Sequence, residues 1–492
     1  MSAPAASKTT RNALVLIITS IFSRGILFIW QITLTTSLGP EMSGIYSTVL
    51  SLMAVSTAVV GFGLGIILIR DVAREPHRMA QYWTATLFLQ TVLGLAAYLL
   101  SVGAALAAGY DDIILAYTAI GGLSLLIDIF GTMASDLLIA QERMTIKSVI
   151  EIGHILLRVG TAVVFLALGW GLLGVYIATL TTGVIRSVLF WGVHAIKGFY
   201  PTMPLDRALT RRLFWDAAPL AVASFFNLLY QHIDKLITTA LIGAASTGYL
   251  VPAFTINQGV VEVLNTTILI SLFPYMSRQY VADPHEYGGR VATLLRLMFV
   301  FSLPVALTIS LFADPIILLI FKDQYAPSIG VLRIFIWYTF LTMIGNVFVQ
   351  ALQVQNRQRR VLWIRLVGLV INVVFTTAVL VAFRNPQGAA LSAVISQVLV
   401  LGLLFMQFRE MAWDTRQGLI YVGRVITMSV VAALVMIIAG QIHFLLGMTL
   451  GLFVYAGLIW RGGLADSDRA LVWQILAILP GHAWLRARLA AQ

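Results

Sequence analysis

The chain begins its first long apolar segment at residues 12–38, which read NALVLIITSIFSRGILFIWQITLTTSL. About 20 consecutive apolar residues are enough for a helix to cross the hydrocarbon core of a membrane. Only Arg24 interrupts this segment, which is too long and wrongly flanked for a signal-peptide core. The segment therefore predicts a membrane-spanning helix.

The rest of the chain repeats this character. Its apolar segments number fourteen, at about 12–38, 45–69, 80–106, 113–139, 146–169, 171–193, 213–242, 248–274, 292–320, 327–352, 361–383, 388–407, 419–439 and 444–460. Hydrophobic residues make up 59% of the chain and charged residues 11%, whereas soluble proteins carry about 25% charged residues. Backbone polar groups in lipid must be satisfied within the segment, so the spans are helices. Strands of a membrane barrel would be shorter and would alternate in polarity. The sequence predicts an all-α membrane protein.

The basic residues follow the gaps between these spans. The N-terminus, every second gap and the tail hold 24 of the 32 Lys and Arg, when Lys147, Arg365 and Arg424 at the starts of their spans are included. The other gaps hold two, and six lie deeper inside spans. Cationic loops resist transfer across the membrane, so this pattern predicts an inner-membrane protein with both termini in the cytoplasm. The net charge of +11 is thus a topology signal, and no nucleic acid is expected as a partner.

Cofactor and metal signals are missing from the sequence. The chain has no cysteine, which excludes disulfides, thiol catalysis and Cys-ligated metals. His154 and His232 lack partners at metal-ligand spacing, and no nucleotide-binding motif is present. We expect no cofactor and no metal site.

The spans divide into two halves with a weak internal repeat. Gly39 and Gly44 after the first span match Gly243 and Gly248 after the seventh, at an offset of 204, and a second pair of turns matches at an offset of 214 (141–143 and 355–357). An even number of helices in each repeat implies parallel repeats. We predict a lobe at 1–195, a cytoplasmic linker at 196–212, a second lobe at 213–410, helices 13–14 at 411–462 and an interfacial tail at 463–492.

Polar residues inside the spans mark candidate sites, because ionisable groups in a bilayer normally face water or a partner. Helical periodicity places polar side chains of the first, seventh and eighth spans on single faces. Glu151, His154 and Arg158 stack on one face of the fifth span, either as a functional group or as an internally neutralised triad. Residues near span ends are expected to snorkel to the interface; these are Asp136, Arg186, Arg296 and Arg333.

Several short motifs recur in an order typical of one family. They are Leu38-Gly39-Pro40-Glu41, Gly44-Ile45-Tyr46, Ile69-Arg70-Asp71-Val72-Ala73-Arg74, Gln141-Glu142-Arg143, Ile233-Asp234, Gly248-Tyr249, Ala313-Asp314-Pro315, Tyr325 and Gly388-Ala389-Ala390. The chain to about residue 460 thereby resembles the Wzx-type polysaccharide flippases of the multidrug/oligosaccharidyl-lipid/polysaccharide exporter superfamily. Met42-Ser43 departs from the acidic residue and aromatic that this family often has before the glycine.

The resemblance implies two six-helix lobes arranged as a V around a central cavity, with two extra C-terminal helices. It implies transport of a polyprenyl (pyro)phosphate-linked oligosaccharide by alternating access, coupled to protons or sodium. Membrane lipid is the other expected partner. We expect substrate-binding residues at Arg24, Gln31, Arg158, Asn227, Gln231, Lys235, Asn257 and Asn265, and ion-coupling residues at Asp234, Glu262 and Asp128.

Other functions remain open at this point. A multidrug or cation antiporter of the same fold would prefer a more acidic cavity, and a flippase for the peptidoglycan precursor fits the same pattern. A membrane glycan polymerase or glycosyltransferase would carry a larger outer loop with catalytic acids, whereas the outer gaps here are a few residues long. A non-transporting scaffold would have no use for polar faces in its spans. We therefore expect a transporter and not an enzyme.

Overall fold

A computed structural model describes residues 5–202, 204–264, 276–278, 280–281, 283, 287–408 and 415–463, without the side chains of 5–18, 20–21, 262–264, 415–417 and 419. Within these ranges the secondary structure is helical and contains no strand. Twelve of the described helical segments are long and apolar enough to cross a membrane. The predicted all-α membrane fold is confirmed.

A backbone break divides the first helix. Helix α1 runs over Ala5–Gly61, but Gly39 has φ 73° and ψ 174° and separates two helical stretches. This region of backbone space is open to glycine and almost closed to other residues. A second break at Phe62 and Gly63, both with positive φ, precedes α2 (Leu64–Arg74). The break at Gly39 thus lies between the first two predicted spans, and both fall within one continuous apolar segment, Phe22–Arg74.

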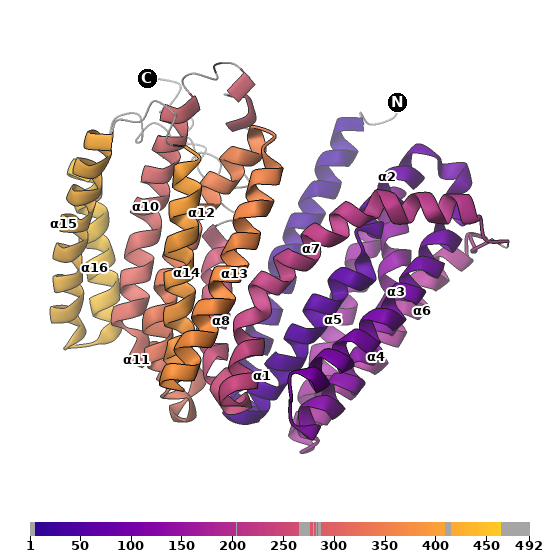
Figure 1. Ribbon diagram of the computed structural model, residues 1–492, viewed down its shortest axis with the longest axis horizontal. Helices are drawn as coiled ribbons and strands as arrows, with labels where there is room; N and C mark the ends of the chain where they lie inside the picture. The colour runs from indigo at the N-terminus through magenta and orange to yellow at the C-terminus, as the bar shows by residue number, and fades with distance from the viewer. Residues whose placement is uncertain are drawn as a thin grey trace. The chain divides into compact units, whose positions relative to one another are not determined.

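The helices group into two compact units. Unit 1 comprises Met1–Val251 with Thr376–Pro386, and unit 2 comprises Pro252–Phe375 with Gln387–Gln492. After α2, unit 1 holds the short helix η1 (Pro76–Arg78), α3 (Met79–Ala107), α4 (Asp112–Ala140), α5 (Met144–Ala167), α6 (Gly171–Ala195), α7 (Arg207–Ile242) and the start of α8 (Ala244–Leu264). In Figure 1, α3, α4 and α6 form one group of helices, and the contacts between α3 and α4 and between α4 and α6 agree with this.

Unit 2 is also helical. Its elements are α10 (Tyr287–Leu311), α11 (Ala313–Phe321), η3 (Asp323–Tyr325), α12 (Ser328–Val354), most of α13 (Gln358–Phe383), α14 (Pro386–Met406), α15 (Thr415–Gly440), α16 (Phe444–Leu458) and η4 (Ile459–Gly463). Helices α15 and α16 pair with each other (Figure 1) and pack on α10, where the Tyr455 hydroxyl donates to the Val300 carbonyl at 2.7 Å. This pair is the predicted addition of helices 13 and 14.

The difference between fourteen predicted spans and twelve observed ones has two sources. The first two spans are counted as one apolar segment, although Gly39 separates them. The eighth begins as α8, but its predicted continuation to residue 274 lies outside the described residues. The lobe boundaries at 196–212 and 411–462, and the tail at 463–492, stay predictions.

The turns that carry the repeat have matching geometry. Glu142 and Asn356, at the predicted offset of 214, both have positive φ, at 57° and 56°. The next residue in each turn donates its N–H to a carbonyl five residues back, Arg143 to Leu138 at 2.8 Å and Arg357 to Leu352 at 2.9 Å. Sequence and backbone therefore agree that the two halves repeat.

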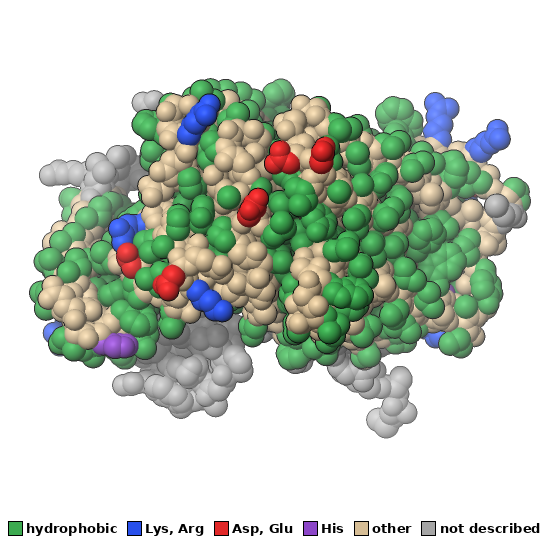
Figure 2. All heavy atoms as spheres, turned by 90° about the horizontal axis from the view of Figure 1, so that it is seen from below, with side chains coloured by type: hydrophobic (Ala, Val, Ile, Leu, Met, Phe, Trp, Pro, Cys, Tyr) green, Lys and Arg blue, Asp and Glu red, His purple; other side chains and the backbone are tan. Residues whose placement is uncertain are grey.

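The surface is apolar, as expected of a protein that faces lipid. Many large apolar side chains are exposed, among them Ile66, Leu99 and Phe453. In Figure 2 apolar side chains are spread among backbone and other side chains, and few charged side chains are seen. At the α3–α4 turn the Tyr110 hydroxyl is buried and donates to the Leu236 carbonyl of α7 at 2.9 Å. Burial raises the pKa of Tyr110 to about 12, so this donor keeps its proton at neutral pH.

Candidate functional site

Asp234 is the most buried of the predicted ion-coupling residues that the structure describes. It lies on α7 with 7% of its surface exposed. Thr376 of α13 donates its hydroxyl to the Asp234 Oδ1 at 3.1 Å, and Thr238 donates to the Asp234 backbone carbonyl at 2.6 Å. A buried carboxylate needs such donors to offset the loss of water. The helix pair α7 and α13 therefore positions this carboxylate.

The other polar residues of α7 differ in exposure and in neighbours. Asn227 and Lys235 are half-buried, whereas Gln231 is exposed. The Nδ1 atom of His232 lies 3.2 Å from the Ser51 hydroxyl of α1. Since α7 contacts both α1 and α13, its polar side chains meet different neighbours, which periodicity within one helix cannot show.

Helix α1 carries two of the predicted substrate-binding residues. Arg24 is exposed on this helix, and Gln31 is half-buried one turn before Thr35. The Gln31 side-chain amide donates to the Thr35 hydroxyl at 3.3 Å. Arg24 thus lies exposed on a helix with many apolar side chains, and part of the Gln31 amide is used within the helix.

A cluster of ionisable side chains joins α4, α5 and α6. Arg186 of α6 donates from Nη2 to Glu151 Oε1 at 2.7 Å and from Nε to Glu151 Oε2 at 3.1 Å. Its Nη1 lies 3.7 Å from Asp128 Oδ1 on α4. Arg186 is 8% exposed, so the expectation that it snorkels to the interface is wrong. Two carboxylates on neighbouring helices hold it inside the bundle instead.

Arg186 also takes up Glu151, one of the three stacked ionisable residues on α5. Glu151 is engaged by Arg186 across the helix interface, so it does not simply neutralise Arg158 on its own helix. His154 Nε2 and Arg158 Nε are buried atoms without a hydrogen-bond partner in the described structure. Arg158 lies within electrostatic reach of Tyr46 of α1 and Asp128 of α4. The structure thus brings two predicted site residues, Asp128 and Arg158, into one cluster.

Unit 2 holds the remaining predicted residues. Asn257 of α8 accepts a short hydrogen bond at Oδ1 from the Thr339 hydroxyl of α12. The Glu262 side chain and the whole of Asn265 lie outside the described residues. Asn257 is therefore the one predicted substrate-binding residue of unit 2 whose contacts can be stated.

Sequence reasoning missed Arg186, Thr376 and Thr339 as partners. Threonine inside a span usually bonds its own helix, as Thr161 does to the Leu157 carbonyl at 2.7 Å, so neither threonine stood out. Arg186 lies within reach of a span end, where snorkelling to the interface is the sequence-based expectation. Within the described ranges no group of three His, Cys, Asp or Glu side chains could hold a metal.

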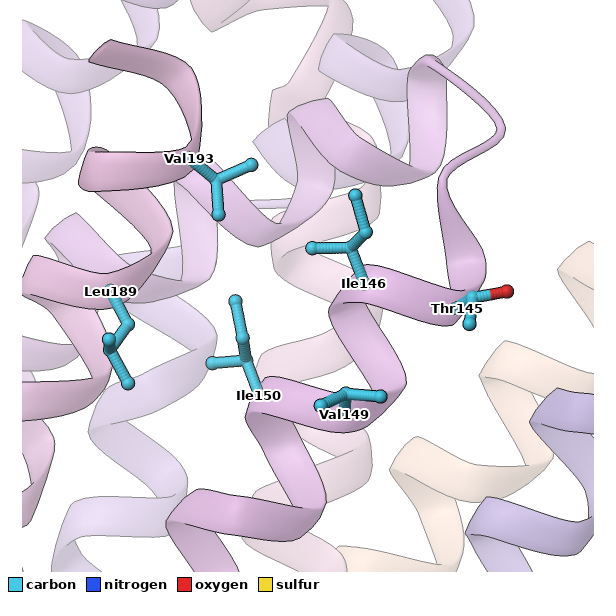
Figure 3. A pocket seen from close by; sticks show the side chains of 6 residues that line it. All are labelled: Thr145, Ile146, Val149, Ile150, Leu189 and Val193. Atoms are coloured by element: carbon cyan, nitrogen blue, oxygen red, sulfur yellow. The ribbon is translucent and has the colours of Figure 1, made fainter. Parts of the chain in front are cut away.

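An apolar groove lies between α5 and α6. It encloses about 350 Å³ and is lined by Thr145, Ile146, Val149, Ile150, Leu189 and Val193. In Figure 3 the aliphatic side chains of the two helices point toward the shared space, and the Thr145 hydroxyl points away from them. Aliphatic side chains cannot hydrogen-bond a sugar, and the Thr145 hydroxyl points away from them, so this groove is not a candidate glycan site.

Comparisons with known proteins identify the fold. The model of a family described as "Polysaccharide biosynthesis protein" matches residues 34–330. The chain is similar to the solved structure "Lipid II flippase MurJ, inward closed conformation", with a TM-score of 0.70 and 12% identity over 90% of this chain and 98% of that one. It is also similar to an inward-facing multidrug resistance transporter of the MATE family, with a TM-score of 0.62 and 17% identity over 78% and 94% of the two chains.

These likenesses show that the chain has the fold shared by the MurJ and MATE structures, as the sequence predicted. A search of curated proteins finds no match.

Proposed function

The chain belongs to the family of polysaccharide biosynthesis proteins, and on this premise we propose that it is a flippase for a polyprenyl (pyro)phosphate-linked oligosaccharide. One observation carries the proposal: a chain of this family has twelve described helical segments long and apolar enough to cross a membrane. Moving one unpaired hydroxyl into hydrocarbon costs about 4–8 kcal/mol. A glycan with many hydroxyls therefore crosses a membrane only with a protein that replaces its water.

The proposed direction is from the inner to the outer leaflet of the cell's inner membrane, with both termini in the cytoplasm. The charge pattern of the gaps supports this topology. The proposed mechanism is alternating access by rocking of helices 1–6 against helices 7–12. The fold likeness to a lipid II flippase supports a lipid-linked substrate.

Arg24 is the proposed phosphate-binding residue. An exposed guanidinium on an apolar helix is costly in lipid and suits an anionic headgroup, which it binds through two parallel hydrogen bonds. Arg158 has a buried Nε without a hydrogen-bond partner in the described structure and is the second candidate. The proposed glycan contacts are Gln31, Asn227, Gln231, Lys235, Asn257 and Asn265.

A cation gradient is the proposed energy source, since no nucleotide-binding motif is present. Asp234 is the leading coupling residue, because it is a buried carboxylate that accepts a hydrogen bond from Thr376 of another helix. Asp128 is the second candidate, although Arg186 already partly compensates its charge. Glu262 is the third candidate.

The test is reconstitution in vesicles that carry a polyprenyl pyrophosphate-linked oligosaccharide, with flipping read from the fraction of glycan accessible outside. We expect Arg24→Ala to slow flipping at least tenfold and Arg24→Lys to retain part of the rate. Arg359→Ala is the matched control, because Arg359 is exposed at the start of α13 and has no assigned contact with substrate. Equal rates for Arg24→Ala and the unchanged protein would remove Arg24 from the site.

The same vesicles discriminate the rival functions. Efflux of an organic cation without flipping would identify a multidrug antiporter, which the likeness to MATE transporters makes the natural competitor. Flipping of the peptidoglycan precursor in preference to other lipid-linked glycans would identify that role. Formation of a new glycosidic bond would make the protein an enzyme and overturn the proposal.

A further inference from the structure

Helix α7 is too long to lie wholly within the hydrocarbon of a membrane. It has 36 residues, which at a rise of 1.5 Å per residue makes it about 54 Å long, whereas the hydrocarbon core is about 30 Å thick. Its first turns carry Arg207, Arg211 and Arg212, so this end of the helix is the one that lies among the lipid headgroups or beyond them. The proposed topology places this end at the inner leaflet.

One face of these first turns is fixed to unit 1. Leu209, Leu213 and Ala217 are at most 5% exposed and belong to the hydrophobic core of the unit. The Asp206 side chain accepts a hydrogen bond from the Leu209 backbone N–H at 3.0 Å and so caps the helix. In Figure 1 the first turns of α7 run beside α2, and the two helices are in contact. The start of α7 is therefore held in place, and its opposite face is left open.

The open face carries two arginines and a tryptophan. Arg207, Arg211 and Trp215 follow one another at intervals of four residues, which places them within about 80° around the helix. All three are exposed, Trp215 by 64%. Tryptophan is enriched where a membrane meets water, because its ring is apolar and its N–H is polar. We call these three residues the basic stripe of α7.

Other arginines beside the stripe already have acidic partners. Arg70 Nε lies 2.7 Å from Asp71 Oδ1, and Arg212 Nη2 lies 3.6 Å from Asp71 Oδ2. Arg212 Nε also lies 3.5 Å from Asp216 Oδ2 on its own helix. These two arginines are therefore engaged within the protein.

The stripe itself is left with free positive charge. Arg78 takes up the remaining acids of this surface, with Glu75 at 3.1 Å and Asp206 at 3.9 Å. Residues 64–78 and 206–218 together hold six arginines and four carboxylates. Among the described residues, no carboxylate forms an ion pair with Arg207 or Arg211. An anion from outside the chain is therefore the natural partner of these two guanidinium groups.

We propose that the basic stripe of α7 binds the headgroups of anionic phospholipids in the inner leaflet. A guanidinium binds a phosphate through two parallel hydrogen bonds, and each basic side chain near an anionic membrane surface strengthens association about fivefold. The exposed residues at 207–218 include no amide or hydroxyl side chain, so the stripe suits a phospholipid better than a glycan. The inference uses the topology proposed above but does not depend on what the protein transports.

The chain has no cysteine, so a single fluorophore can be placed beside the stripe. Ala208→Cys serves for this, because Ala208 is exposed between the two arginines. The labelled protein is reconstituted in phosphatidylcholine vesicles in which one fifth of the lipid is a spin-labelled quencher, either phosphatidylglycerol or phosphatidylcholine. We expect phosphatidylglycerol to quench at least twofold more strongly. Equal quenching by the two lipids would overturn the proposal, and so would no quenching by either, which would place this face in water.

A matched pair of variants separates the stripe from net charge. Arg207→Gln with Arg211→Gln should abolish the preference for phosphatidylglycerol. Arg357→Gln with Arg359→Gln removes the same charge from exposed positions at the turn before α13 and the start of that helix, and should keep the preference. Equal losses in the two variants would show that overall charge attracts the lipid and would overturn a site on α7.

A competition experiment separates phospholipid from transport substrate. Unlabelled lipid-linked oligosaccharide, added in an amount equal to the protein, should leave the quenching by phosphatidylglycerol unchanged. Loss of that quenching would assign the stripe to the substrate and overturn a phospholipid site. A protein that flips no lipid-linked oligosaccharide but keeps the preference for phosphatidylglycerol would uphold the stripe and overturn the proposed function instead.

Discussion

Arg186 of α6 and Glu151 of α5 form a two-pronged ion pair, with 2.7 Å between Nη2 and Oε1 and 3.1 Å between Nε and Oε2. Their side chains are 10% and 25% exposed. Two parallel hydrogen bonds between a guanidinium and a carboxylate fix both distance and orientation. The pair therefore sets how α5 and α6 meet within unit 1.

Breaking this pair should be costly because it leaves one charge uncompensated inside the bundle. We expect Arg186→Ala to lower the free energy of unfolding by about 3 kcal/mol, measured by denaturant titration in detergent. Replacing both residues, as in Arg186→Met with Glu151→Leu, should recover most of the loss. Arg333 and Asp314 form a control pair with side chains 50% and 49% exposed, and Arg333→Ala should cost less than about 1 kcal/mol. Equal losses for the two arginines would refute the buried role of Arg186.

Asp234 and Thr376 supply a second prediction. Thr376→Val removes the hydroxyl that donates to the carboxylate at 3.1 Å, and a hydrogen bond to a charged group contributes about 1.5–3 kcal/mol. We expect a loss of stability in this range and a weaker dependence of flipping on the cation gradient. Thr161→Val is the matched control, because Thr161 bonds only carbonyls of its own helix in the described contacts. If both valine variants respond alike to the gradient, Thr376 has no part in coupling.

Lys322 supplies a prediction on backbone strain. It follows α11 with φ 68° and ψ 175°, nearly the conformation of Gly39, which is open almost only to glycine. Lys322→Gly should relieve this strain and raise the free energy of unfolding by about 1 kcal/mol. The opposite sign is expected for Arg359→Gly, which places glycine in α13 and should cost up to about 1 kcal/mol. A destabilised Lys322→Gly variant would show that its side chain contributes more than the strain costs.

Tyr110 links the α3–α4 turn to α7 through its hydroxyl. Tyr110→Phe keeps the ring and removes the donor to the buried Leu236 carbonyl, which should lower stability by about 1–3 kcal/mol. Tyr200→Phe is the control, because Tyr200 is 56% exposed and donates to the Ala195 carbonyl, which water can satisfy instead. Thermal unfolding of the two variants in detergent would separate the effects, and similar midpoints would argue against the link.

The sequence by itself determined the class of fold. Apolar segments of spanning length must become helices in lipid, so the membrane-spanning architecture followed from composition and spacing alone. The repeat was also visible, since the glycines at 39, 44, 243 and 248 and the turns at 142 and 356 occur at regular offsets. Glycines and turn residues occur where the backbone adopts a particular local conformation, so their positions can be recognised from the sequence alone.

Only the tertiary structure decided which polar groups meet. The sequence placed Arg186 near a span end and Thr376 in an apolar run, and neither position reveals a partner on another helix. The ion pair with Glu151, the hydrogen bond to Asp234 and the close approach of Gly44 to the Ala244 carbonyl join residues 35, 142 and 200 positions apart. Helical periodicity shows which residues share a face but not which helix that face meets, because packing between helices selects the partner.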